Sequence, residues 1–189
     1  MKAFQLYTFV FLSVVMVLSC SKDDSDKQPV PDNKALIVNG TAYELSQATI
    51  TYEGLDPLNE GHQYELTIVS ASFDMERGTG TGEGLGLTII TAGKEIVEGT
   101  YTFDGDPART LNSFSAYVVV DFNIETWERK HFFVVTSGTV NITQDGIHNY
   151  TVNMSVKADD IDDDDNIITS NNTITVNYSG TFTYEEYDE

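Results

Sequence analysis

Carboxylate side chains are concentrated in one short stretch of the sequence, residues 159–166, which contains six aspartates. A cluster of this kind can surround a hard cation such as Ca²⁺, which takes about six to eight oxygen ligands. Within the stretch, Asp160, Asp162 and Asp164 alternate and are the candidate ligands. Ca²⁺ is therefore the only cofactor that the sequence suggests.

The acidic stretch does not match the calcium-binding loop of an EF-hand. If Asp160 took position 1, position 6 would be Asp165 where that loop needs glycine, and position 12 would be Asn171 where it needs glutamate. Because strand-like segments flank the stretch, a solvated, self-repelling turn is the simpler interpretation. The sequence favours the turn and keeps calcium binding as the alternative.

Trp127 is the only tryptophan, and it lies in a polar segment, residues 125–129, that is typical of a turn. An exposed aromatic ring on a β domain can stack on a sugar ring, and Tyr52, Tyr184 and Tyr187 could play the same part. The alternative is that the indole folds back over the edge of the sheet. The sequence favours the folded-back ring and keeps Trp127 as the candidate ligand-binding residue.

Alternating glycines, Gly78, Gly80, Gly82, Gly84 and Gly86, form the second unusual pattern. They are not a dinucleotide-binding fingerprint, because a strand-like rather than a helical segment follows them. One interpretation is a flexible hairpin tip, which the sequence favours. The other is a strand with one face of bare backbone, which a ligand or another chain could approach closely.

The sequence contains no recognisable catalytic constellation. His62, His131 and His148 are scattered without the spacing of metal ligands. Neither a Gly-x-Ser-x-Gly elbow nor a cysteine nucleophile is present, and no pair of carboxylates stands out as a glycosidase pair. We therefore expect a protein that is not an enzyme.

The N-terminal segment has the pattern of an export signal. Lys2 precedes an apolar run over residues 3–18, and Ser19 precedes Cys20, the only cysteine. The tetrapeptide at residues 17–20, Val-Leu-Ser-Cys, resembles a lipobox. The resemblance implies that residues 1–19 are a signal peptide and that Cys20 becomes the lipid-carrying first residue; the alternative is a membrane anchor with an incidental cysteine.

Residues just after Cys20 indicate a destination. Lys22, Asp23 and Asp24 resemble the export signal of Bacteroidota-type lipoproteins. That resemblance implies a lipid-anchored protein on the outer face of the outer membrane. The polar residues 20–34 are also expected to be a disordered tether, since they cannot build a core.

Charge narrows the range of partners. The chain has 10 basic and 30 acidic residues, for a formal net charge of −20. Such a field argues against nucleic acid, whose phosphates are bound by Lys and Arg. It also argues against binding to anionic lipid headgroups, so we expect the N-terminal acyl chains to attach the protein to the membrane.

Alternation of apolar and polar residues predicts about ten β-strands after the tether. The predicted strands cover residues 35–38, 49–52, 64–68, 85–89, 99–103, 114–124, 132–135, 140–142, 150–156 and 174–184. Asn39-Gly40 and the Gln144-Asp145-Gly146 segment are predicted turns between them.

These patterns predict a single all-β domain over residues 35–189. An antiparallel β-sandwich is the favoured architecture, and a closed up-and-down barrel is the alternative. Segments such as Gly-Thr-Tyr-Thr-Phe at 99–103 and Ser-Gly-Thr-Phe at 179–182 resemble small β-rich surface lipoproteins of the Bacteroidota type. We expect a lipid-anchored cell-surface module that binds or adheres to a glycan or protein. A structural or accessory subunit of a fimbria-like assembly is the alternative, and a hydrolase is the third hypothesis.

Overall fold

The computed structural model describes residues 30–56, 61–105 and 110–186, and every regular secondary-structure element within them is a β-strand. The predicted all-β class is confirmed. No described segment forms a helix that could span a membrane. The strands are β1 (Lys34–Val38), β2 (Thr41–Glu44), β3 (Gln47–Asp56), β4 (Gly61–Val69), β5 (Thr81–Thr91), β6 (Gly99–Phe103), β7 (Ser113–Asn123), β8 (His131–Gln144), β9 (Asn149–Ile161), β10 (Ile167–Thr181) and β11 (Thr183–Glu186).

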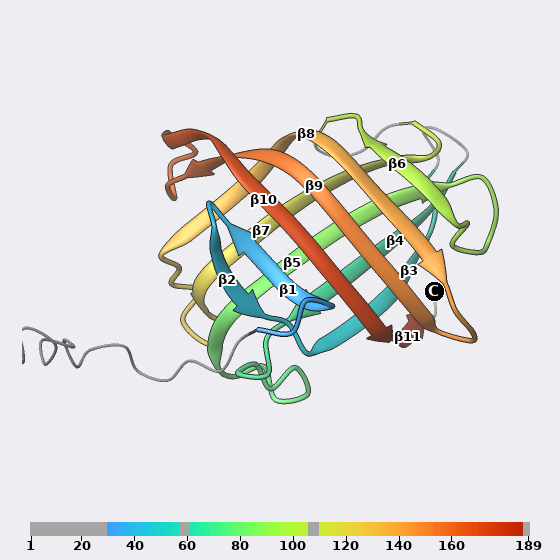
Figure 1. Cartoon of the computed structure of the whole chain (residues 1–189), viewed down its shortest axis with the longest axis horizontal. Helices are drawn as coiled ribbons and strands as arrows, with labels where there is room; N and C mark the ends of the chain where they lie inside the picture. The colour runs from blue at the N-terminus through green and yellow to red at the C-terminus, as the bar shows by residue number, and fades with distance from the viewer. Residues whose placement is uncertain (1–29, 57–60, 106–109, 187–189) are drawn as a thin grey trace, which may run out of the picture.

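All eleven strands belong to one sheet, in the order β11-β3-β4-β5-β7-β6-β8-β9-β10-β1-β2. Figure 1 shows this sheet strongly curled, with β8, β9 and β10 crossing in front of β3, β4 and β5. The predicted sandwich is therefore wrong, because a single sheet bends around the core instead of two sheets facing each other. The barrel alternative is closer, but the result is a half-barrel whose terminal strands, β2 and β11, are not paired with each other among the described residues.

Parallel pairings make the sheet mixed. β6 lies between β7 and β8 at one end, parallel to β7 and antiparallel to β8. β11 continues from β10 after Phe182 and pairs in parallel with β3. The predicted single strand over residues 174–184 is therefore split in two, and its second half joins the opposite side of the half-barrel.

Turn chemistry follows the sequence closely. Asn39 and Gly40 have φ values of 50° and 87° and connect β1 to β2, as their preference for positive φ predicts. The predicted turn after Gln144 connects β8 to β9. The two segments predicted at 132–135 and 140–142 are one strand, β8, interrupted by a bulge between Val135 and Ser137.

The concave side of the sheet holds the core. Inward positions alternate along each strand, as in Tyr150, Val152, Met154 and Val156 of β9, which are all buried. Large aromatic side chains, among them Tyr64, Tyr101, Phe114, Tyr178 and Phe182, fill the middle. With the interior occupied by side chains, sites for ligands have to lie on the outer face or at the ends of the half-barrel.

Candidate functional site

A shallow apolar groove crosses the outer face of the half-barrel over β4, β5, β7 and β8. Outward positions on these strands alternate with buried ones, so Val69, Tyr117 and Val119 lie opposite the core. The groove has a volume of about 440 Å³ and also reaches the loops that hold Met75 and Trp127. An outer face would normally be polar, so this concentration of apolar side chains marks a candidate binding surface.

Glycines form the floor of the groove. Gly82, Gly84 and Gly86 lie within β5, so the favoured interpretation of the glycine run as a flexible hairpin tip is wrong for these positions. The ring of Tyr117 lies directly on the backbone of Gly86, in the space that a Cβ would occupy. A Cβ at Gly84 would come within 3.1 Å of Val69. The bare strand face thus lets neighbouring side chains lie flat against the sheet.

Trp127 is at the edge of the groove and points outward. Its side chain is 74% exposed, so the favoured prediction of a folded-back ring is wrong. The indole contacts Phe122 edge-on, with ring centroids 5.8 Å apart and an interplanar angle of 75°. Its backbone has φ of 60°, a conformation that is unusual for a bulky residue. The β7–β8 loop therefore presents the indole at a conformational cost.

Arg129 is the single cation among the described residues that line the groove. Its guanidinium lies 4.2 Å from the centre of the Phe132 ring, a cation–π contact. The same side chain makes a 3.2 Å ion pair with Asp163, in the turn between β9 and β10. The acidic turn thereby holds Arg129 against the aromatic wall.

Acidic residues surround the groove. Burial raises the pKa of Tyr117, and Glu65 nearby raises it further. Burial also raises the pKa of Glu65, and the charge of Glu53 adds to this effect. Glu53 and Glu65, together with Glu76, which lines an adjoining polar hollow, make the surroundings of the groove acidic, whereas Asp163 is paired with Arg129.

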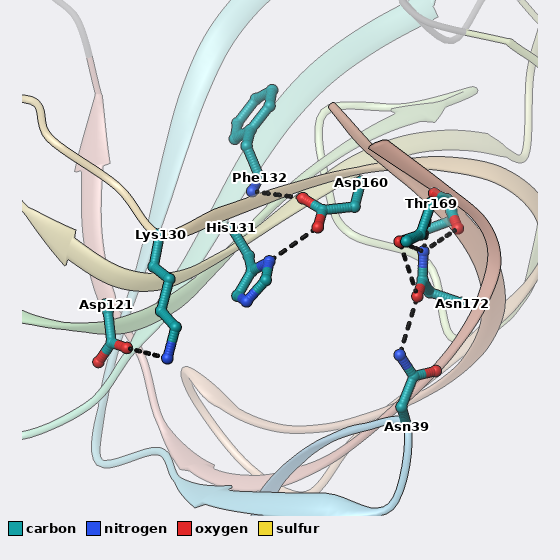
Figure 2. A network of polar contacts seen from close by, with 9 residues as sticks. Asn39, Asp121, Lys130, His131, Phe132, Asp160, Thr169 and Asn172 are labelled. Atoms are coloured by element: carbon teal, nitrogen blue, oxygen red, sulfur yellow. Dashed lines mark hydrogen bonds and ion pairs between the residues drawn. The ribbon is translucent and has the colours of Figure 1, made fainter. Parts of the chain in front are cut away.

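The candidate calcium ligands do not converge. Asp160 is 2% exposed at the end of β9, where its Oδ2 lies 2.7 Å from Nδ1 of His131 and its Oδ1 accepts a hydrogen bond from the amide of Phe132 (Figure 2). Asp162 accepts hydrogen bonds from the amides of Asp164 and Asn166. Among the described residues no three acidic, histidine or cysteine side chains are grouped as metal ligands.

The side chains of Asp160 and Asp162 each have a role in the fold. Asp160 ties β9 to the start of β8, where the ring of His131 also stacks on Phe133 at 5.6 Å. The hydrogen bonds from Asn166, followed by that from Asp164, lower the pKa of Asp162. The structure therefore uses the acidic stretch as the predicted hairpin turn between β9 and β10.

Two of the remaining candidate residues belong to the described part of the structure. Tyr52 and Tyr184 lie near the end of the half-barrel that holds β11, far from Trp127 in the strand order. Cys20, Lys22, Asp23, Asp24 and Tyr187 are outside the described residues.

Comparison of the chain with known protein families, with curated proteins and with solved structures finds no match. The groove and its surroundings are therefore the basis for assigning a function.

Proposed function

We propose that this protein is a lipid-anchored binding module of the bacterial cell surface, and that the groove beside Trp127 binds a protein partner. The observation that carries the proposal is Trp127 itself, held outward at φ of 60° beside an apolar, glycine-floored groove. Strained backbone of this kind persists where the surrounding structure enforces it, and it concentrates at functional sites.

The side chains of the groove favour a protein over a glycan. Trp127, Tyr117, Arg129, Phe132 and Met75 are of the types enriched at the centres of protein interfaces. A glycan site needs side chains that hydrogen-bond sugar hydroxyls, and the groove offers few. The partner segment would place apolar side chains on Tyr117 and Trp127.

Charge complementarity defines the ends of that partner segment. The net charge of −20 and the acidic residues Glu65 and Glu76 favour basic flanks, because opposite potentials speed encounter and like charges oppose it. We therefore propose a partner whose apolar anchor residues are flanked by Lys or Arg.

The alternative of a fimbria-like subunit receives little support from the sheet. Strand addition needs an exposed strand that can form a ladder with its partner. The terminal strands β2 and β11 are each 4 residues long, which limits the ladder that either could form.

A selection from a random-peptide library tests the groove. Phage selected on the wild-type protein should converge on aromatic or aliphatic residues flanked by basic ones. A synthetic peptide with that consensus should lose affinity by about thirtyfold in Trp127→Ala, the size typical of an interface hot spot. Ile147→Ala is the control, because Ile147 is 83% exposed but lies outside the groove.

Two results would overturn the groove assignment. One is a selection that yields only peptides insensitive to Trp127→Ala. The other is a glycan array with hits that depend on Trp127, which would indicate that the groove binds a glycan rather than a protein.

Lipid attachment has a separate test in cells. Labelling with a clickable palmitate analogue should mark the wild-type protein and leave Cys20→Ala unlabelled and of higher mass, because the signal peptide would be retained. Surface protease treatment of intact cells should remove the wild-type domain. Labelling of the Cys20→Ala variant would contradict the lipobox assignment.

A further inference from the structure

A second hollow lies at the end of the half-barrel that holds β11, between the β5–β6 loop, the β8–β9 turn and β11. It has a volume of about 320 Å³. Unlike the groove, it combines aromatic rings with hydrogen-bonding groups. The polar and aromatic residues that define it are Tyr64, Tyr150, Tyr184, His148, Glu95 and Gln144.

Two of its tyrosines are deeply buried yet have hydroxyls without a hydrogen-bond partner in the described residues. Tyr64 is 2% exposed and Tyr150 is 9% exposed. Among the described residues, Ser46 Oγ is the only polar side-chain atom that is fully enclosed and has no hydrogen-bond partner. The hydroxyls of Tyr64 and Tyr150 also have no partner, so they are not fully enclosed by the protein. Buried polar groups nearly always have a partner, so hydroxyls left open to a hollow indicate that water or a ligand completes them.

The phenols gather at the base of this hollow. Burial raises the pKa of Tyr64, and the neighbouring Tyr184, Tyr52 and Tyr150 raise it further. Burial also raises the pKa of Tyr150, with additional contributions from Tyr184 and Glu95. Both phenols are therefore protonated at neutral pH, and each hydroxyl can donate as well as accept a hydrogen bond.

The rim of the hollow supplies flat apolar surface. Tyr184 is 38% exposed, and its ring is tilted against that of His148 at 5.5 Å. Ile147 and Ile96 also line the hollow. Lys94, the one cation among the described residues of the lining, is paired with Glu186 at 2.8 Å. Within the described lining, an anionic ligand would therefore meet no unpaired Lys or Arg and would meet Glu95.

We infer that this hollow, which we call the tyrosine pocket, binds a neutral sugar ring, either a free monosaccharide or the terminal residue of a glycan. Sugar hydroxyls donate and accept hydrogen bonds as phenols do, and the C–H face of a pyranose packs on aromatic rings. Small-ligand sites have this composition, an apolar and aromatic lining with a few convergent polar groups. The tyrosine pocket is separate from the groove, so the inference does not depend on the proposed protein partner.

Saturation-transfer NMR on the whole protein, with neutral hexoses and their methyl hexosides at millimolar concentration as probes, tests this inference. At least one of these sugars should receive saturation from the protein. Tyr64→Phe and Tyr150→Phe each remove only a hydroxyl and should weaken its binding by about three- to tenfold, the usual effect of one hydrogen bond. Tyr178→Phe is the matched control, because Tyr178 is 2% exposed and is not part of the lining.

The outcomes separate the two sources of the sugar. Binding of methyl hexosides and of neutral trisaccharides that end in the same residue supports a terminal glycan residue. Binding of the reducing monosaccharide alone supports a free sugar. The inference is overturned if no neutral sugar binds, if the Tyr64→Phe/Tyr150→Phe double variant binds as well as wild type, or if Tyr178→Phe weakens binding equally.

Discussion

At the scale of single residues, Trp127 combines an exposed indole ring with an unfavourable backbone conformation. A β-branched residue should tolerate φ of 60° poorly, whereas asparagine adopts this region readily. We expect Trp127→Val to have a free energy of unfolding about 1–2 kcal/mol lower than that of Trp127→Asn, although both lose the contact with Phe122. Urea denaturation measures the difference, and equal stabilities would contradict the strained loop.

Asp160 and Asp164 differ in role although both were candidate cation ligands. Asp160 is buried against His131 and the amide of Phe132, whereas Asp164 is exposed. Asp160→Ala should therefore lower the free energy of unfolding by about 1–3 kcal/mol, because the amide of Phe132 and the ring of His131 both lose a hydrogen-bond partner. Asp164→Ala should change it by less than about 0.5 kcal/mol. Equal effects in urea melts would show that the buried contact is not formed.

Glu65 makes stability depend on pH. Its pKa is raised in the folded state by burial and by Glu53, so the folded protein binds protons more tightly than the unfolded chain. Stability therefore falls as pH rises from the ordinary carboxyl pKa through the raised one. Glu65→Gln should be more stable than wild type at pH 7, and the difference should vanish below about pH 4.

Urea melts at the two pH values measure this effect. Glu53→Gln should reproduce part of the gain at pH 7, since Glu53 is the second cause of the shift. A gain from Glu65→Gln that is the same at both pH values would point to packing rather than charge.

At the scale of elements, the contact between β5 and β7 depends on the missing Cβ of Gly86. Gly86→Ala would place a methyl group inside the Tyr117 ring, and overpacking of this kind costs about 1–3 kcal/mol. In a Tyr117→Ala background the same change should cost close to nothing, a coupling that a double-mutant cycle measures. Gly93→Ala is the control, since a Cβ there would meet nothing within 4 Å.

At the scale of the whole molecule, a net charge of −20 opposes the compact state. Raising the salt concentration should increase the melting temperature by several degrees, because screening weakens this self-repulsion. CaCl₂ and NaCl at matched ionic strength should give the same increase, since the candidate ligands do not converge. If CaCl₂ raised the melting temperature more than NaCl and this excess disappeared in Asp162→Ala, the acidic turn would be a calcium site.

The sequence predicted the strands better than their arrangement. Alternation shows which side chains face the core, and it is the same for a sandwich and a curled sheet, so it could not distinguish them. β11 was missed as a separate strand because Phe182 and Tyr184 continue the alternation of β10 across the break. The direction in which the chain turns there is set by its pairing with β3, far away in the sequence.

The groove was only partly predictable. Trp127 and the glycines were visible as unusual residues, but their exposure and setting depend on tertiary contacts. Consecutive apolar residues were the available signal, since Val118, Val119 and Val120 break strict alternation and place an apolar side chain on the outer face. The tyrosine pocket left no local signal, because Tyr64, Tyr150 and Tyr184 come from three separate strands.

The position of β1 has a mechanical consequence. β1 forms five residue pairs with β10 on one side and four with β2 on the other, and it is the first strand after the proposed tether. A pull on the tether along the strand axis loads both ladders in shear, so that their hydrogen bonds must yield together rather than one at a time. The proposed N-terminal anchor would therefore resist drag on a domain that is held at the proposed binding groove.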